Sequence, residues 1–237
     1  MFAVFKRDLF SYFTTPVGYV FMAIFLAVNG GIFSMNTLQL GTESSLSGYF
    51  TTMMLLFVIL IPILTMKTFS EEKKQKTEQL LMTSPVSIGG MVFGKFLAAY
   101  TIFAGTFLLG CFNFVAIDRF ASDPPNWASI WGSVIALLLL GMAFVAIGVF
   151  VSALTENQFI AILLTAGVMG AFLVIGLYNT HIPFAPLREA LSWLSVYSRF
   201  GNFNYGILDF AALLYYVSIT FVFLFLTVRV FEKRRWA

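Results

Sequence analysis

The hydrophobic residues of this chain gather in six long runs that are separated by short polar segments. A helix of about 20 residues crosses the roughly 30 Å of hydrocarbon in a bilayer. The run that begins near residue 88 is longer than this, which indicates tilt or an extension beyond the membrane. The pattern predicts an all-α polytopic membrane protein, a single domain over 1–237, with transmembrane helices at approximately 17–35, 49–66, 88–117, 128–154, 159–178 and 209–231.

A shorter pattern precedes the first run, in residues 1–16. Apolar side chains recur there at helical spacing, while Lys6, Arg7, Asp8 and Ser11 occupy the other side. This arrangement predicts an amphipathic interfacial helix in the headgroup plane, and a plain juxtamembrane tail is the alternative. The apolar side of the predicted helix consists of Phe2, Phe5, Leu9, Tyr12 and Phe13.

Charge is concentrated in one internal segment, 67–87, between the second and third runs. Acidic and basic side chains alternate in it, and Glu72 and Lys76 have the favourable i,i+4 spacing of a helical ion pair. An apolar tip follows, and Pro85 is expected to end the helix. We expect this helix to dock into a groove of a soluble partner, although a solvated connector is the alternative. Its distinctive residues are Glu71, Glu72, Thr77, Glu78, Leu80, Leu81 and Pro85.

A second mixed segment, 179–208, separates the fifth and sixth runs. Pro186 can start a helix there, with an apolar stripe opposed by polar residues. The segment is predicted either to lie on the membrane surface or to dip into it as a re-entrant helix. The apolar stripe consists of Leu187, Leu191, Trp193 and Leu194.

The distribution of basic residues predicts the orientation in the membrane. Six spans place both termini on one side, and that side would hold eleven of the 14 Lys and Arg residues. Basic residues accumulate in cytoplasmic loops, so both termini are predicted to be cytoplasmic. The same rule explains the net charge of +3 without nucleic acid as a partner. The predicted location is the cell membrane, plasma or inner, with several passes.

No motif in the chain predicts catalysis or a nucleotide site. GGMVFGKF at 89–96 spells G-x-x-x-x-G-K, but Phe96 replaces the Ser or Thr that would hold magnesium, and the string opens an apolar helix. Lys95 is expected to extend to the inner membrane interface. The single Cys111 and the single His181 argue against a disulfide or a metal site. We therefore expect a protein that is not an enzyme and binds no cofactor itself.

Polar residues are scarce inside the predicted spans. Asn29 and Asn113 are the main ones, and interhelical hydrogen bonding is favoured over substrate contact. Coupled carriers move protons or ions through ionisable residues in their spans, so an ion-coupled carrier is disfavoured.

The motifs resemble those of one known family, the ABC-2-type permeases of ATP-binding cassette transporters. The resemblance rests on FSEEKKQKTEQLLMTSPVSIGGMVFGKFLAA from Phe69, on the ending RFGNFNYGILDFAALLYYVSITFVFLFLTVRVFEKRRW from Arg199, and on the opening FKRDLFSYFTTPVGYV from Phe5. It covers essentially the whole chain and is closest to the gliding-motility-associated permeases. Lys76 stands where this family usually has Gly.

The resemblance implies a half-transporter, and motif position assigns its contacts with a partner. A separate cytoplasmic ATPase subunit would bind ATP and magnesium and dock on the 67–87 segment and on the N-terminal helix, at Phe5, Lys6, Arg7 and Leu9. A second permease subunit, identical or different, would complete the pathway, and cargo would move outwards. The stripe in 179–208 would form an outer gate, and any large extracellular domain would come from an auxiliary partner.

A different class of function also accounts for the charged segment. A membrane anchor or assembly scaffold that does not transport could recruit a soluble protein through it. For a transporter, the apolar and small residues of the spans suit a lipid-like, peptide or polysaccharide cargo.

Overall fold

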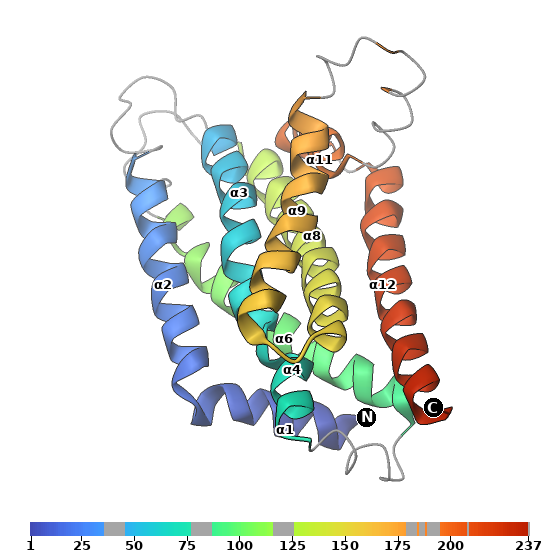
Figure 1. Ribbon diagram of the computed structural model, residues 1–237. Helices are drawn as coiled ribbons and strands as arrows, with labels where there is room; N and C mark the ends of the chain where they lie inside the picture. Colours follow the sequence, from blue (N-terminus) through green and yellow to red (C-terminus); the bar gives the residue numbers. More distant parts are fainter. Residues whose placement is uncertain are drawn as a thin grey trace.

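Six long helices form the body of the protein in the computed structural model (Figure 1). The structure describes residues 1–35, 46–76, 87–115, 126–178, 184, 188, 195–207 and 209–236. Within these residues the regular structure is entirely helical, and six helices are long and apolar enough to cross a membrane, which confirms the predicted fold class. They are α2 (Pro16–Phe33), α3 (Leu46–Thr65), α6 (Ile88–Gly110), α8 (Trp127–Leu154), α9 (Gln158–Tyr178) and α12 (Phe210–Trp236).

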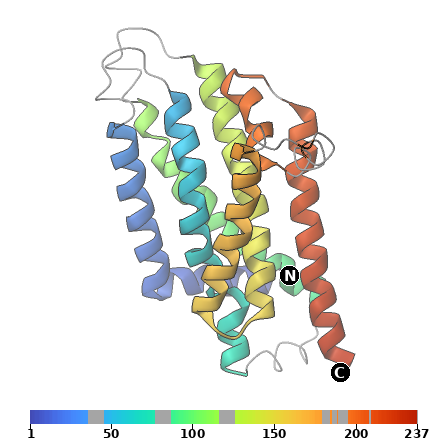
Figure 2. The same ribbon diagram turned by 45° about the horizontal axis from the view of Figure 1, so that its top comes forward.

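Three short helices cover the ends of this bundle. The predicted N-terminal helix is present as α1, which runs across the ends of the long helices (Figures 1 and 2). Both chain ends lie at the same end of the bundle as α1, and we call this the basal end; the opposite end, where α11 lies, is the apical end. The short helices are α1 (Phe2–Thr14), α4 (Lys67–Lys74) and α11 (Val196–Asn204).

The elbow between α1 and α2 follows from local sequence. Thr15 has an extended backbone, and Pro16 occupies the first turn of α2, where its missing N–H costs no helical hydrogen bond. Gly18 allows the two helices to meet, because a Cβ there would lie 2.2 Å from the carbonyl oxygen of Tyr12. The chain therefore turns sharply from a helix across the bundle into a helix along it.

The core of the bundle is centred on α8. In its most hydrophobic stretch 72% of the residues are buried, against 22% in α9 and in α12. Phenylalanine rings fill the space between α2, α3 and α6: the Phe57 ring lies 4.9 Å from that of Phe103 and 5.7 Å from that of Phe107, in edge-to-face geometry. Such aromatic pairs contribute roughly 0.5–1.5 kcal/mol each beyond their buried area. The rings therefore hold these three helices as one packed group.

The long run predicted at 88–117 is not one regular helix. The helix α6 ends at Gly110, a turn occupies Cys111 and Phe112, and helical structure resumes at residues 113–115. The break brings the side chain of Asn113 towards α2, as described below.

Asp209 caps the apical end of α12. Its Oδ1 accepts hydrogen bonds from the N–H groups of Ala211 at 2.9 Å and Ala212 at 3.4 Å, and its Oδ2 accepts one from Asn202 Nδ2 at 3.1 Å. The hydrogen bond from Asn202, followed by those from the helix backbone, holds the pKa of the Asp209 carboxyl below its usual value. The cap joins α12 to the end of α11.

This cap predicts a pH-dependent contribution to stability. Because the pKa of Asp209 is lower in the folded protein, its stabilisation is complete above the unfolded pKa of about 4 and is lost as pH falls through the folded pKa. We expect Asp209→Ala to lower the thermal unfolding midpoint at neutral pH and to match the wild type in acid. Asp209→Asn keeps an oxygen that does not titrate and serves as the control. A deficit of Asp209→Ala that is the same at every pH would contradict the assignment.

Candidate functional site

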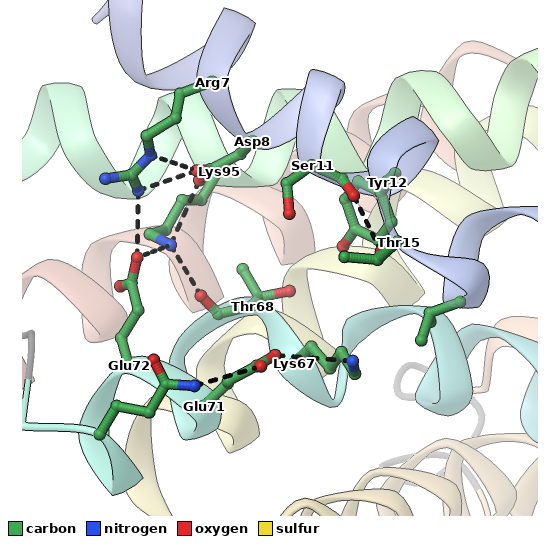
Figure 3. A pocket seen from close by; sticks show the side chains of 12 residues that line it. Arg7, Asp8, Ser11, Tyr12, Thr15, Lys67, Thr68, Glu71, Glu72 and Lys95 are labelled. Carbon is green, nitrogen blue, oxygen red and sulfur yellow. Dashed lines mark hydrogen bonds and ion pairs between the residues drawn. The ribbon is translucent and has the colours of Figure 1, made fainter.

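Four charged side chains from α1, α4 and α6 meet at the basal end, and we call them the charge quartet (Figure 3). Lys95 Nζ on α6 lies 2.8 Å from Glu72 Oε1 on α4 and 3.2 Å from Asp8 Oδ2 on α1. Arg7 Nη2 on α1 lies 3.0 Å from the same Glu72 oxygen and 2.8 Å from Asp8 Oδ1. Lys95 also donates to the carbonyl oxygen of Thr68 at 2.8 Å. Two cations and two anions thus join three helices.

The centre of the quartet is the buried ammonium group of Lys95. Its side chain is 4% exposed, whereas those of Asp8 and Glu72 are 16% and 19% exposed. Removing an ammonium from water costs several kcal/mol unless opposite charges and hydrogen-bond acceptors surround it, as they do here. The Lys95 ammonium is thus held inside the protein by α1 and α4; whether it also lies at the level of the membrane interface, as the sequence predicts, stays a prediction.

Close packing of α1 on α6 makes this contact possible. A Cβ added at Gly94 would lie 3.1 Å from the carbonyl oxygen of Met1 and 3.3 Å from the N–H nitrogen of Phe5. A larger residue at position 94 would push α1 away from α6. The two residues of the G-K pair therefore act together. Gly94 allows α1 to pack closely on α6, and Lys95 binds the Asp8 carboxylate of α1.

Arg7 and Tyr12 of α1 keep their usual protonation near neutral pH. Burial lowers the pKa of Arg7, but the hydrogen bonds and negative charges of Asp8 and Glu72 outweigh it and raise that pKa. Burial raises the pKa of Tyr12 to about 12. The neutral Tyr12 hydroxyl donates to the carbonyl oxygen of Leu64 at 3.2 Å, which joins α1 to the end of α3.

On its other side, α4 is attached to α8 by one buried hydroxyl. Ser152 Oγ accepts hydrogen bonds from the N–H groups of Phe69 at 3.0 Å and Ser70 at 3.1 Å, and it donates to the carbonyl oxygen of Met66 at 3.1 Å. Met66 provides no side-chain cap for α4, and Ser152 instead binds two N–H groups of its first turn from the side of α8.

Further contacts fix α4 to the neighbouring helices. Lys73 Nζ lies 3.4 Å from Glu156 Oε1 in the turn between α8 and α9. The ring of Phe69 lies 4.7 Å from that of Phe231 on α12. The helix α4 is therefore held between α1 and α6 on one side and α8 and α12 on the other.

The junction between α3 and α4 is a weak point in an otherwise continuous helix. Pro62 cannot donate a backbone hydrogen bond, and Met66 separates the end of α3 from the start of α4. A displacement of α4 can therefore bend the chain here without unfolding α3.

The end of α4 differs from the sequence-based prediction. The helix ends at Lys74 and so does not continue to Pro85, and Lys76 has a φ of 57°. Lys76 is the one non-glycine residue with positive φ in the part of the chain that the structure describes. The predicted Glu72–Lys76 pair is wrong, because Lys76 has left the helix; the i,i+4 pair present in α4 is Lys67–Glu71, at 3.7 Å.

The positive φ of Lys76 explains why the resembled family usually has glycine at this position, since glycine adopts that conformation without strain. A left-handed residue at a helix C-terminus costs roughly 1–2 kcal/mol unless it is glycine. We expect Lys76→Gly to slow hydrogen exchange at the amides of Gln75 and Lys76 about fivefold. Lys74→Gly, inside the helix, is the matched control and should speed exchange. Equal effects of the two glycines would contradict the assigned conformation.

The remaining predicted residues of α1 and α4 lie around the quartet. Glu71 pairs with Lys67, and its Oε1 accepts a hydrogen bond from Gln75 at 3.4 Å. On α1, Phe5 and Leu9 are partly buried and Lys6 is exposed. The other predicted coupling and gate residues lie outside the described residues: Thr77, Glu78, Leu80, Leu81, Pro85, Leu187, Leu191, Trp193 and Leu194.

The structure brings the two predicted intramembrane asparagines together. Asn113 Nδ2 donates to Asn29 Oδ1 at 3.0 Å, and Asn29 Nδ2 donates to the Tyr49 hydroxyl at 2.9 Å. Asn29 is fully buried. These hydrogen bonds link α2, α3 and the end of α6, so the amides are engaged with each other and with tyrosine.

Sequence reasoning missed Asp8, Lys95 and Ser152 as site residues. A signal existed for Lys95, since a lysine two turns inside a predicted span requires a partner, and Asp8 and Glu72 are acidic residues in the flanking segments. No signal distinguished Ser152 from other small residues of its apolar run.

The fold and the site define a class first. Six helices long and apolar enough to cross a membrane, with a cluster of charged side chains at one end around a short helix between spans, make it a multi-pass membrane protein. A family model described as ABC-2 family transporter protein matches residues 10–236. The chain therefore belongs to the ABC-2 family of transporter proteins and is a transporter permease subunit. Membership implies partnership with an ABC ATPase subunit.

A search among curated proteins gave no match. Glu72 and Lys95 lie inside the range matched by the family model, whereas Arg7 and Asp8 precede it. The nearer resemblance to gliding-motility-associated permeases stays a prediction.

Proposed function

We propose that this permease subunit works in an ATP-driven exporter, in which a separate cytoplasmic ATPase acts on the basal end. The observation that carries the proposal is the charge quartet. It joins α4, the described part of the predicted docking segment, to α1 and α6 through Glu72, Asp8 and Lys95.

The orientation is proposed from charge. The basal end holds the basic residues of α1, α4 and the end of α12, including Lys233, Arg234 and Arg235 in its last turn. Basic segments stay on the cytoplasmic side, so the basal end and both termini face the cytoplasm. The ATPase would then meet α1 and α4 directly.

The coupling step follows from the two attachments of α4. The ATPase contacts α4, the residues after it and α1, and binding and hydrolysis of ATP push on them. The quartet carries this displacement to α6, and Ser152 carries it to α8. Bending at the junction near Met66 allows α4 to move while α3 stays helical. The spans then rock and release cargo outwards.

The proposal also assigns the other components. ATP and magnesium bind to the ATPase, and a second permease subunit, identical or different, faces this one. The complex resides in the plasma or inner membrane. An extracellular auxiliary protein would supply any large outer domain.

The test is co-purification with the ATPase subunit, followed by measurement of ATP hydrolysis. Wild type should form a complex in which hydrolysis depends on the permease. Glu71→Lys with Glu72→Lys, and separately Leu80→Asp, should reduce hydrolysis to the rate of the isolated ATPase. Glu232→Lys, a partly exposed carboxylate at the same end, is the matched control. Intact assembly and turnover in both test variants would contradict the proposed coupling.

A further inference from the structure

A polar cavity of about 260 Å³ lies between α1 and α4, beside the charge quartet (Figure 3). Ser11, Tyr12 and Thr15 line it from the side of α1, and Val17 lines it at the start of α2. One water molecule occupies about 30 Å³ of liquid, so the cavity has room for a small polar group as well as for solvent.

The charges that line this cavity balance. The four residues of the quartet pair with one another on the inner wall. Lys67 and Glu71 are the other two charged residues of the lining, with side chains 27% and 39% exposed. Lys67 Nζ lies 3.7 Å from Glu71 Oε2, which is close enough for an ion pair but too far for a hydrogen bond. Both groups can therefore still bind a ligand. Three cations and three anions favour a zwitterion over an anion or a cation.

The position of the cavity limits what can reach it. It borders the elbow of Thr15 and Val17, where the helix across the bundle becomes a membrane-crossing helix. An amphipathic helix attached to a span in this way lies at the level of lipid headgroups. Phe13 and Tyr19 are exposed at the same elbow, and their rings pair at 6.3 Å. They offer apolar surface to acyl chains next to a polar cavity.

We propose that this cavity binds the headgroup of a zwitterionic aminoalkyl phospholipid. The Lys67 ammonium binds the phosphate. The Glu71 carboxylate binds the amino group of the lipid. The bound lipid fills the space between α1 and α4 and holds them at a fixed spacing. This assignment requires a membrane but no ATPase.

The experiment is native mass spectrometry of the purified full chain in detergent, titrated with phosphatidylethanolamine or phosphatidylglycerol. Wild type should retain one phosphatidylethanolamine per chain in preference to phosphatidylglycerol. Lys67→Gln and Glu71→Gln should each weaken retention about tenfold, as expected for loss of a hydrogen bond to a charged group. Arg229→Gln and Glu232→Gln remove an exposed ion pair at the same end and should leave retention unchanged.

Three outcomes would overturn the proposal. Equal retention of phosphatidylglycerol would show that the cavity does not select a zwitterion. Unchanged retention in both cavity variants would place the lipid elsewhere. Soluble phosphoethanolamine that competes as well as the lipid would assign the cavity to a free phosphomonoester. None of these measurements includes the ATPase, so their failure is separate from failure of the proposed coupling.

Discussion

Lys95→Met is expected to destabilise the protein by about 3 kcal/mol and to uncouple it from the ATPase. The substitution keeps the length of the side chain but removes the buried charge that faces Asp8 and Glu72. Loss of one partner of a buried pair costs roughly 3–5 kcal/mol. The lower end applies, because Arg7 still lies within 3.0 Å of both carboxylates. Unfolding in detergent and ATP hydrolysis of the complex measure the two effects.

The charge itself, and not the loss of bulk, is predicted to cause this effect. Neutralising the carboxylates in the triple variant Asp8→Asn, Glu72→Gln, Lys95→Met should restore most of the stability, since no uncompensated buried charge remains. It should not restore coupling, because the joint between the helices is still missing. Lys233→Met, at an exposed position of the same end, is the matched control. A stable and fully coupled Lys95→Met variant would remove the quartet from the mechanism.

Ser152→Ala is expected to destabilise the basal end by about 2 kcal/mol. The hydroxyl is fully buried, and its removal leaves the N–H groups of Phe69 and Ser70 without their partner on α8. Each buried unsatisfied donor costs roughly 1–3 kcal/mol, and loss of a helix cap alone costs about 1 kcal/mol. The loss should appear as faster hydrogen exchange confined to α4.

The exchange pattern separates this attachment from general loosening of the bundle. Ser218→Ala removes a hydroxyl that bonds to Leu214 within α12 and lies on the exposed side, so it should leave α4 unchanged. Equal acceleration in α4 and in the core of α8 after Ser152→Ala would contradict a local cap. Unchanged exchange in α4 would show that Phe69 and Ser70 do not depend on Ser152.

The fold could be predicted from sequence because hydrophobic length is a local property. Each span needs only about 20 apolar residues in succession, and α1 needs only apolar side chains at helical spacing. Both signals are present in the sequence without reference to the rest of the chain. Asn29 and Asn113 were identified in the same way, since an amide inside a span stands out from its neighbours.

The site could be predicted only in part because it is made by contacts between distant segments. Glu72 was identified as a polar residue of a charged segment, but its partners lie elsewhere in the chain. Arg7 is 65 residues before it, and Lys95 is on α6. Periodicity shows which face of a helix is polar and does not show which helix it meets. Lys95 therefore looked like a residue at the edge of a span, although its charge is buried.

The helix of the charged segment was placed too far along the chain for a related reason. Charged residues at favourable spacing support helix from Glu71 through Lys76, and nothing in the spacing marks an end. The end is set by the backbone at Lys76, whose positive φ is rare for a residue with a side chain. The glycine usual at this place in the resembled family was the available indication.

The central claim is that Lys95 and Glu72 act as one joint between the ATPase and the spans. A double-mutant cycle on ATP hydrolysis by the assembled complex tests it, with Lys95→Met, Glu72→Gln and the two together. If the two residues share one joint, the double variant hydrolyses ATP no more slowly than the slower single variant. Losses that multiply, as for two independent sites, would contradict the account.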